Sequence, residues 1–288
     1  MRTRAIGGRQ VGQVGLGGMP MSIEGRPDQG RAMATVHAAL DAGVTLIDTA
    51  DAYHLKAGEV GHNETLLARA VASWGGDSSA VLIATKGGHL RPGDGSWTRN
   101  GSPDYLKQAC EASLQRLGVA AIGLYQFHRP DPEVPFADSI GALKELHDAG
   151  KIQMAGISNA DPAQIRTARE ILGDRLVSVQ NQFSPAFRSS EPELELCAEL
   201  GLAFLPWSPL GGIGRAAGLG RRFAPFARIA DQLGVSPQRV CLAWLLARSP
   251  AVIPIPGASR PETIRDSVAA GELELTPEQL AELDRTGG

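Results

Sequence analysis

Short apolar segments alternate with segments of helical periodicity along nearly the whole 288-residue chain. Eight apolar runs begin near positions 14, 44, 81, 123, 152, 176, 203 and 251, and helical patterns separate most of them. Alternating strands and helices favour a parallel sheet covered by helices, and eight repeats favour closure of that sheet. The sequence therefore predicts an α/β protein, a (β/α)8 TIM barrel.

Further elements are expected at both ends of the barrel. Gly7 and Gly8 lie between two short apolar segments, which is typical of an N-terminal β-hairpin. Thr276 followed by Pro277 predicts a C-terminal extra helix. No linker or shift in composition divides the chain, so residues 1–288 are expected to form a single domain.

Local signals place several helix starts and two loops. Ser102, Asp161 and Ser236 each precede a proline and are predicted helix N-caps. Residues 87–102 are rich in glycine and predict a long irregular loop, which in a compact domain is usually functional or disordered. Residues 211–222 predict a second, short and glycine-rich loop.

Composition narrows the class of protein. Hydrophobic residues make up 43% and charged residues 20% of the chain, as in ordinary globular proteins. The net charge of −3 gives no reason to expect nucleic acid or an anionic membrane as a partner. The N-terminus lacks the apolar stretch of a signal peptide, and no apolar run reaches the length of a membrane span.

The three cysteines point to a location and to a role in packing. They are far apart in the sequence and form no CxxC or His/Cys cluster, so neither disulfides nor a metal site is expected. A reducing, cytoplasmic location is expected, with the cysteines filling the core.

Titratable side chains follow three successive predicted strands. Asp48 ends the apolar run that begins at residue 44, and Tyr53 follows five residues later. Lys86 and His128 end the next two runs. The carboxyl ends of barrel strands carry the active sites of such proteins, so these four side chains are expected to meet there.

The four residue types suit the reduction of a carbonyl group. A free tyrosine is a poor acid, with a pKa of about 10. Lys86, held by Asp48, is expected to lower the pKa of Tyr53 and make it a usable proton donor. His128 can then donate to a carbonyl oxygen and orient it.

Motifs along the chain resemble those of the aldo-keto reductase superfamily. The resemblance covers nearly the whole chain, and the motifs follow one another in the order of the family. They are Ile47-Asp48-Thr49-Ala50 with Tyr53, Ala84-Thr85-Lys86, Phe127-His128-Arg129-Pro130-Asp131, Gly156-Ile157-Ser158-Asn159, Gln180-Asn181, Trp207-Ser208-Pro209-Leu210-Gly211 and Ile253-Pro254-Ile255-Pro256-Gly257.

The resemblance implies a nicotinamide cofactor and assigns roles to residues of this chain. It makes Tyr53 the general acid, Lys86 and Asp48 the residues that tune it, and His128 the residue that orients the substrate. Trp207 occupies the position of the aromatic residue that stacks on the nicotinamide ring. The other implied cofactor contacts are Gly17, Gly18, Met19, Asp48, Ser158, Asn159 and Gln180 near the nicotinamide, Ser208, Pro209, Leu210 and Gly211 at the pyrophosphate, and Ile255, Pro256, Gly257, Ser259, Arg260, Arg265, Asp266 and Ser267 towards the adenosine.

Two segments depart from the family pattern. Ser259 replaces a frequent basic residue, and Ser267 replaces the usual adenine-contacting asparagine. Arg260 and Arg265 remain as partners for a 2′-phosphate, so NADPH is favoured over NADH. Residues 211–222 are shorter than the family loop that folds over the cofactor, and we expect weaker cofactor retention.

Several alternatives remain open at this stage. The leading hypothesis is an NADPH-dependent reductase of a small-molecule aldehyde or ketone. An NADPH-binding regulatory or sensor subunit with little turnover is one alternative, and an aldolase that uses Lys86 as a Schiff-base nucleophile is another. The G-x-G-x-x-G spacing fails in residues 12–20, which disfavours a Rossmann domain.

Some neighbouring residues have two interpretations, and some properties are not indicated. His54, His89 and Trp97 either line the substrate pocket or belong to solvated loops, whereas Arg129 and Asp131 are interpreted as loop structure. The sequence indicates neither the oligomeric state nor the substrate.

Overall fold

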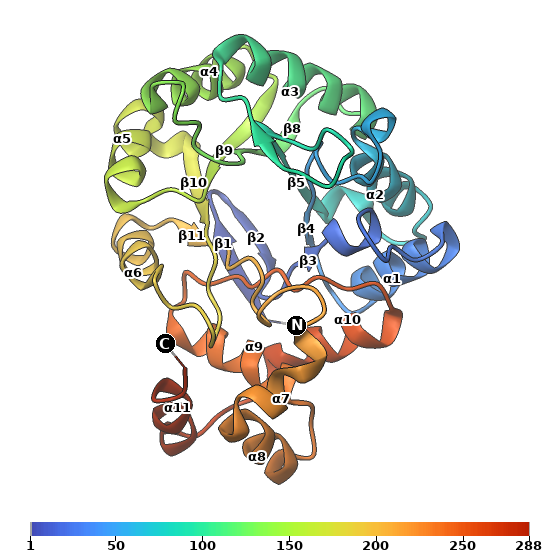
Figure 1. The fold of residues 1–288 in the computed structure, drawn as a ribbon, viewed down its shortest axis with the longest axis vertical. Helices are drawn as coiled ribbons and strands as arrows, with labels where there is room; N and C mark the ends of the chain where they lie inside the picture. The colour runs from blue at the N-terminus through green and yellow to red at the C-terminus, as the bar shows by residue number, and fades with distance from the viewer. Residues whose placement is uncertain (1, 288) are drawn as a thin grey trace.

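A computed structural model describes residues 2–287 of the chain. Its core is a curled parallel sheet of seven strands surrounded by helices, as Figure 1 shows. In spatial order the strands are β11 (Ala203–Phe204), β10 (Leu176–Gln180), β9 (Ile152–Ser158), β8 (Ile122–Phe127), β5 (Leu82–Gly87), β4 (Leu46–Asp48) and β3 (Leu16–Gly17). The predicted barrel of strands and helices is confirmed.

The segment from Ala251 to Gly257 closes the barrel without being a regular strand. The predicted eighth strand at residue 251 is therefore not a regular strand, although the segment lies between β11 and β3, where an eighth strand would close the barrel. Pro254 and Pro256 have no N–H to donate, which prevents a continuous hydrogen-bond ladder. Isolated backbone hydrogen bonds join this segment to the strands on either side of it instead. They are Phe204 N to Ala251 O at 2.8 Å, Ile253 N to Phe204 O at 2.9 Å, Gly15 N to Pro254 O at 2.9 Å, and Gly17 N to Pro256 O at 2.9 Å.

Eight helices form most of the outer layer of the barrel. They are α1 (Gln29–Asp41), α2 (His62–Ala72), α3 (Pro103–Leu117), α4 (Phe136–Asp148), α5 (Pro162–Leu172), α6 (Glu191–Leu200), α9 (Pro237–Arg248) and α10 (Pro261–Val268). Single 3-10 turns occur at Met19–Met21, Ala57–Glu59, Ser78–Ala80, Gly173–Arg175, Ala216–Gly218 and Ala269–Glu272. The three cysteines are buried and unpaired, as predicted.

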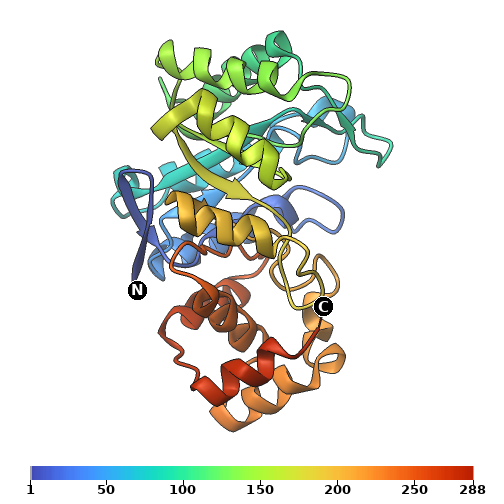
Figure 2. The same cartoon turned by 90° about the vertical axis from the view of Figure 1, so that its left-hand side faces the viewer.

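Three further helices within residues 2–287 lie outside the barrel beside α9. They are α7 (Leu219–Arg222), α8 (Ala224–Leu233) and the predicted C-terminal helix α11 (Pro277–Asp284). Figure 1 and Figure 2 both show α8 and α11 together below the barrel. Trp244 of α9 contacts both of these helices. Its ring packs edge-on against Phe226 of α8, and its Nε1 donates to Asp284 of α11 at 2.8 Å.

The predicted helix starts are confirmed in position, and three of them cap as expected. The side chains of Asp161, Ser236 and Thr276 each accept a hydrogen bond from the N–H three residues later. Ser102 is the N-cap residue of α3, but its hydroxyl donates to Asn100 Oδ1 and caps no helix N–H. The expected capping role of its side chain is therefore wrong.

Two β-hairpins lie at opposite ends of the barrel. The predicted N-terminal hairpin, β1 (Thr3–Ile6) and β2 (Arg9–Gly12), crosses the barrel end in Figure 1 and packs Ile6 and Val11 against the interior side chains. A second hairpin, β6 (His89–Leu90) and β7 (Thr98–Arg99), lies within the segment predicted to be irregular. The predicted loop therefore contains one short hairpin, which gives this segment a defined backbone beside the strand ends.

Among residues 2–287, no helix combines the length and the apolar character that crossing a membrane requires.

Candidate active site

The four residues predicted from strand ends converge at the carboxyl end of the barrel. Asp48 ends β4, Lys86 lies in β5, His128 follows β8, and Tyr53 lies in the loop after β4. Lys86 is fully buried, Asp48 is 3% exposed, Tyr53 6% and His128 7%. The lysine and aspartate therefore lie beneath the tyrosine and histidine, whose small exposed surfaces open towards solvent.

Lys86 connects the other groups through its ammonium. Its Nζ lies 2.7 Å from Asp48 Oδ2, 2.9 Å from Thr49 O and 3.1 Å from Tyr53 Oη. These three bonds use all the protons of the ammonium. Because Tyr53 Oη accepts from the lysine, its own proton remains available for a different acceptor.

Burial and charge act in opposite directions on these groups. Burial alone would lower the pKa of Lys86, but Asp48 and Tyr53 outweigh it and raise that pKa above its usual value. Burial raises the pKa of Tyr53, although Lys86 opposes this shift. The expectation of a lowered tyrosine pKa is thus wrong for the protein alone. The phenol stays protonated at neutral pH, which is the form that a proton donor needs.

His128 is neutral and faces Tyr53. Burial, followed by the charge of Lys86, lowers the pKa of His128 well below its usual range. Its ring lies edge-on to the Tyr53 ring, with 5.7 Å between centroids, and its buried Nδ1 has no partner among the described residues. A neutral imidazole has one N–H to donate and can hydrogen-bond a carbonyl oxygen.

Two glutamine side chains hold Asp48 in place, and the sequence analysis had named only one of them. Gln180 Nε2 donates to Asp48 Oδ1 at 2.8 Å, and Gln126 Nε2 donates to the same oxygen at 3.3 Å. Gln180 was predicted as a cofactor contact, whereas Gln126 was missed. Strand alternation could have revealed it, because Gln126 lies two residues before His128 and points to the same face.

A buried pair of acidic residues, Asp51 and Glu64, lies near Lys86 and was also missed. Burial, with the nearby charge of Glu64, raises the pKa of Asp51 well above its usual range. Glu64 accepts from Thr85 Oγ1 at 2.6 Å and from Arg116 Nε at 2.5 Å. Thr85 precedes Lys86, so this network fixes the backbone of β5 at the lysine.

The predicted nicotinamide contacts lie beside the four residues. Ser158 Oγ donates to Gln180 O at 2.7 Å, and Asn159 Nδ2 donates to His128 O at 3.0 Å. Asn159 Oδ1 accepts from Trp207 Nε1 at 3.2 Å. Asn159 and Ser208 have positive φ values of 57° and 51°, which are uncommon for residues other than glycine and gather at functional sites.

Gly17 and Gly18 are required by packing at the end of β3. A Cβ on Gly17 would lie 2.8 Å from Ile255 O, and one on Gly18 would lie 2.6 Å from Asn63 Oδ1. Met19 follows them and is partly exposed. The two glycines therefore bring the first strand end close to the closing segment and to α2.

The predicted pyrophosphate segment has an unusual backbone. Gly211, Gly212 and Gly214 have positive φ values of 90°, 101° and 75°. Arg222 of α7 reaches back to this segment, because its Nη2 lies 3.0 Å from the position of a Cβ on Gly211. Pro209 and Leu210 are buried beneath it. The loop thus offers turned backbone and a guanidinium, which suit an anion.

The residues predicted to contact the adenosine fall into two groups. Some side chains are exposed and unbonded, and others are buried or bonded within the protein. Arg260 and Arg265 are exposed, and their side chains form no hydrogen bond or ion pair within residues 2–287, while Ser259 is partly exposed. Asp266 accepts from Ser236 Oγ at 2.5 Å and from Arg239 Nη2 at 2.7 Å, and Ser267 is buried. Ile255 and Pro256 are buried, and Gly257 forms a bridge to Gly17.

Ion pairs join three loops around the mouth of the barrel. Arg91 pairs with Glu24 and donates to His54 O at 2.5 Å. Arg26 pairs with Glu59 at 3.0 Å and lowers the pKa of that carboxyl to about 2. The segments 22–28, 51–61 and 87–102 are therefore connected to one another. His54 is buried here, whereas His89 and Trp97 stack with 4.8 Å between their rings.

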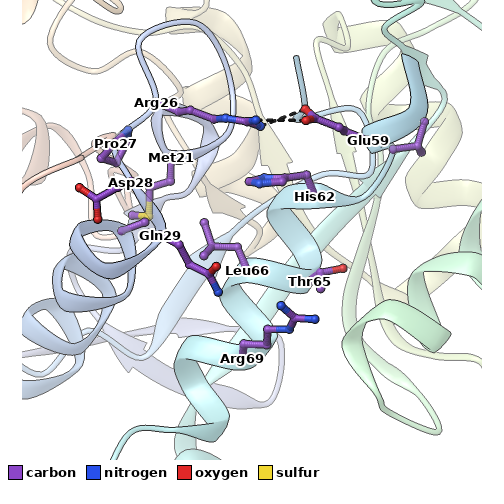
Figure 3. A pocket seen from close by; sticks show the side chains of 12 residues that line it. Met21, Arg26, Pro27, Asp28, Gln29, Glu59, His62, Thr65, Leu66 and Arg69 are labelled. Atoms are coloured by element: carbon purple, nitrogen blue, oxygen red, sulfur yellow. Dashed lines mark hydrogen bonds and ion pairs between the residues drawn. The ribbon is translucent and has the colours of Figure 1, made fainter. Parts of the chain in front are cut away.

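A cavity of about 470 Å³ lies outside the four residues, between segment 22–28 and the helices α1 and α2. Figure 3 shows Arg26 and Glu59 meeting at its edge and His62 and Arg69 pointing into it from α2. None of the four predicted catalytic residues lines it. Over the described part of the chain, no group of three His, Cys, Asp or Glu side chains is arranged to hold a metal ion.

Comparisons with known proteins match this architecture over nearly its full length. A profile described as the aldo/keto reductase family matches residues 13–287. An uncharacterised oxidoreductase of Schizosaccharomyces pombe is 34% identical over 289 residues, which cover 99% of this chain and 90% of that protein.

Solved structures are similar along the whole barrel. A glycerol dehydrogenase from Gluconobacter oxydans superposes with a TM-score of 0.83 at 26% identity, covering 98% of this chain and 94% of that one. An aldo/keto reductase from Klebsiella pneumoniae, solved in complex with NADP and acetate, gives a TM-score of 0.83 at 28% identity with the same coverage.

Proposed function

The chain belongs to the aldo/keto reductase family, and from that premise we propose that it is an NADPH-dependent reductase of an aldehyde or ketone. The observation that carries the proposal is the contact of Lys86 Nζ with both Asp48 Oδ2 and Tyr53 Oη. It leaves a protonated phenol beside a neutral imidazole, at the mouth of a barrel. This arrangement suits proton donation to an oxygen that gains negative charge.

The residues present fit a dinucleotide cofactor. Trp207 and Asn159 lie next to the catalytic groups, the glycine-rich segment and Arg222 suit a pyrophosphate, and the free guanidinium groups of Arg260 and Arg265 suit a 2′-phosphate. The complexes of the Klebsiella pneumoniae relative with NADP and NADPH support this choice of cofactor. When bound, NADPH supplies the hydride that the carbonyl carbon accepts.

The chain's own groups supply the proton and the orientation. In the proposed reaction Tyr53 and His128 both contact the carbonyl oxygen, and Tyr53 transfers its proton to that oxygen as the alcohol forms. Lys86 stabilises the resulting phenolate through its hydrogen bond to Oη, and Asp48 keeps the lysine charged. Gln126 and Gln180 hold Asp48 in position.

The alternatives receive less support. A Schiff-base aldolase needs a lysine with a depressed pKa, whereas Asp48 and Tyr53 outweigh burial and raise the pKa of Lys86. A cofactor sensor without turnover would not need Lys86 bonded to both Asp48 and Tyr53, nor His128 facing the tyrosine.

The test is the oxidation of NADPH and NADH with a panel of aldehydes and ketones, using wild-type protein and Tyr53→Phe. We expect turnover with NADPH that falls by about 10²–10⁴ in kcat in the variant, since general acid catalysis contributes factors of that size. The variant should bind NADPH normally, because it lacks only the hydroxyl. Cofactor binding without turnover on any carbonyl would support the sensor alternative instead.

A further inference from the structure

Arg129 lies next to the proposed reaction centre and lacks an acidic partner. It directly follows His128, and its Nη2 donates to Asn159 Oδ1 at 3.2 Å. Trp207 Nε1 donates to the same oxygen. The guanidinium therefore lies between the strand end that carries His128 and the predicted nicotinamide-stacking residue. Its Nε is buried and has no partner among the described residues.

Arg99 brings a second positive charge to the same region. It lies in β7 opposite His89 in the hairpin register, and its Nη1 donates to Pro130 O at 3.4 Å. Burial, and then the charge of Arg99, lowers the pKa of Arg129, so the two cations are close enough to repel each other. Neither arginine forms an ion pair within residues 2–287.

The acidic residue nearest to Arg129 in the sequence, Asp131, is hydrogen-bonded to backbone N–H groups instead. Asp131 Oδ2 accepts from Gly101 N at 2.8 Å, and its Oδ1 accepts from Glu133 N at 3.1 Å. Its interpretation as loop structure agrees with these contacts. By contrast, Arg26, Arg91 and Arg116 at the same end of the barrel are each paired with a glutamate. Unpaired like charges cost free energy, which a bound anion would offset.

The positive region reaches the place where the carbonyl would bind. The His89 ring lies 4.8 Å from the His128 ring and meets it edge-on. Burial together with Arg129, Arg99 and Lys86 lowers the pKa of His89 to about 4. Trp97 stacks on His89 and adds a flat apolar surface beside that ring. A substrate here meets an apolar wall and a pair of cations.

We infer that the carbonyl substrate also carries a carboxylate, which binds Arg129 with help from Arg99 while the carbonyl meets Tyr53 and His128. A guanidinium suits a carboxylate because two N–H groups match its two oxygens. The substrate class is therefore an oxo acid, with the carbon chain or ring between its two ends packed against His89 and Trp97. This inference rests on the proposed carbonyl reduction.

The test compares an acid with its uncharged counterpart. The substrates are 4-carboxybenzaldehyde and its methyl ester, and the proteins are wild type, Arg129→Gln and Arg99→Gln. Arg69→Gln is the matched control, because Arg69 is exposed on α2 and lines the separate cavity. We expect wild-type kcat/KM to favour the acid by at least about tenfold, the size of effect of a charge-assisted hydrogen bond. Arg129→Gln should abolish that preference, Arg99→Gln should reduce it, and Arg69→Gln should leave it unchanged.

A binding measurement separates this inference from the proposed function. In the presence of NADPH, 4-(hydroxymethyl)benzoate should quench tryptophan fluorescence at lower concentration than its amide, and Arg129→Gln should remove the difference. Arg129-dependent binding without turnover would support the anion site and contradict the reductase. Equal use and equal binding of acid and uncharged compound, or an acid preference that survives Arg129→Gln, would overturn the oxo-acid inference.

Discussion

Lys86 is the residue on which the site depends most. It is fully buried and contacts Asp48, Thr49 O and Tyr53 within 3.1 Å. A buried charge is costly unless it is paired, and here the pairing also brings the ammonium to the phenol oxygen. One contact therefore serves both stability and the proposed chemistry.

Removing Lys86 alone should destabilise the fold more than removing the pair. Lys86→Met leaves Asp48 as a buried, unpaired carboxylate, which typically costs about 3–5 kcal/mol in free energy of unfolding. Lys86→Met combined with Asp48→Asn leaves no charge and should recover part of that loss. Urea denaturation of the two variants measures the difference. A double variant no more stable than Lys86→Met would contradict the pairing.

His89 should make stability depend on pH. Burial and neighbouring cations lower its pKa from 6.5 to about 4 in the folded protein, so the unfolded chain binds more protons between these values. Stability should therefore rise from about pH 4 to 6.5 and be lost as the pH falls. The contribution is about 1–2 kcal/mol after allowance for the partial exposure of the ring.

Denaturation midpoints of wild type and His89→Gln across that range test this expectation. The variant should show a weaker dependence on pH, although His128 has a lowered pKa as well and will retain part of it. Parallel curves for the two proteins would show that His89 does not contribute.

At the scale of elements, the segment from Gly211 to Arg222 replaces the longer loop that the family resemblance implies. Because this loop is short, the sequence led us to expect weaker retention of the cofactor. The structure adds α7, which brings Arg222 to Gly211 and lets Arg222 Nη2 donate to Arg215 O at 2.8 Å. A short helix thus presents a cation where the pyrophosphate is proposed to bind.

Arg222→Gln should weaken NADPH binding by about tenfold or more, the loss expected for one charge-assisted hydrogen bond. Arg221→Gln is the matched control, since Arg221 is an exposed neighbour on the same helix. Fluorescence titration with NADPH measures both dissociation constants. Equal constants in the two variants would remove Arg222 from the pyrophosphate site. Slow release of cofactor from wild type would count against weak retention.

The elements that the sequence failed to describe share a physical cause. Pro254 and Pro256 interrupt a segment that still closes the barrel through isolated bonds, which an apolar pattern does not reveal. The hairpin of β6 and β7 pairs only His89–Leu90 with Thr98–Arg99, too few residues to show alternation. Both features depend on tertiary pairing rather than on local preference.

At the scale of the whole molecule, the barrel was predictable because its strands and helices repeat with strong signals. Asp48, Lys86 and His128 were found because each ends an apolar run, and the structure brings them together with Tyr53. Gln126, Asp51 and Glu64 were missed because contacts across the barrel, not sequence position, give them their importance. The pKa of Tyr53 was misjudged because burial outweighs the lysine.

The central claim is that this barrel transfers hydride from NADPH to a carbonyl carbon while Tyr53 protonates the oxygen. The most direct measurement mixes stoichiometric protein, NADPH deuterated at the transferred position, and 4-carboxybenzaldehyde, and then analyses the alcohol by mass spectrometry. We predict an alcohol with one deuterium from wild type and little from Tyr53→Phe at equal cofactor occupancy. Undeuterated alcohol, or equal yields from both proteins, would contradict the account.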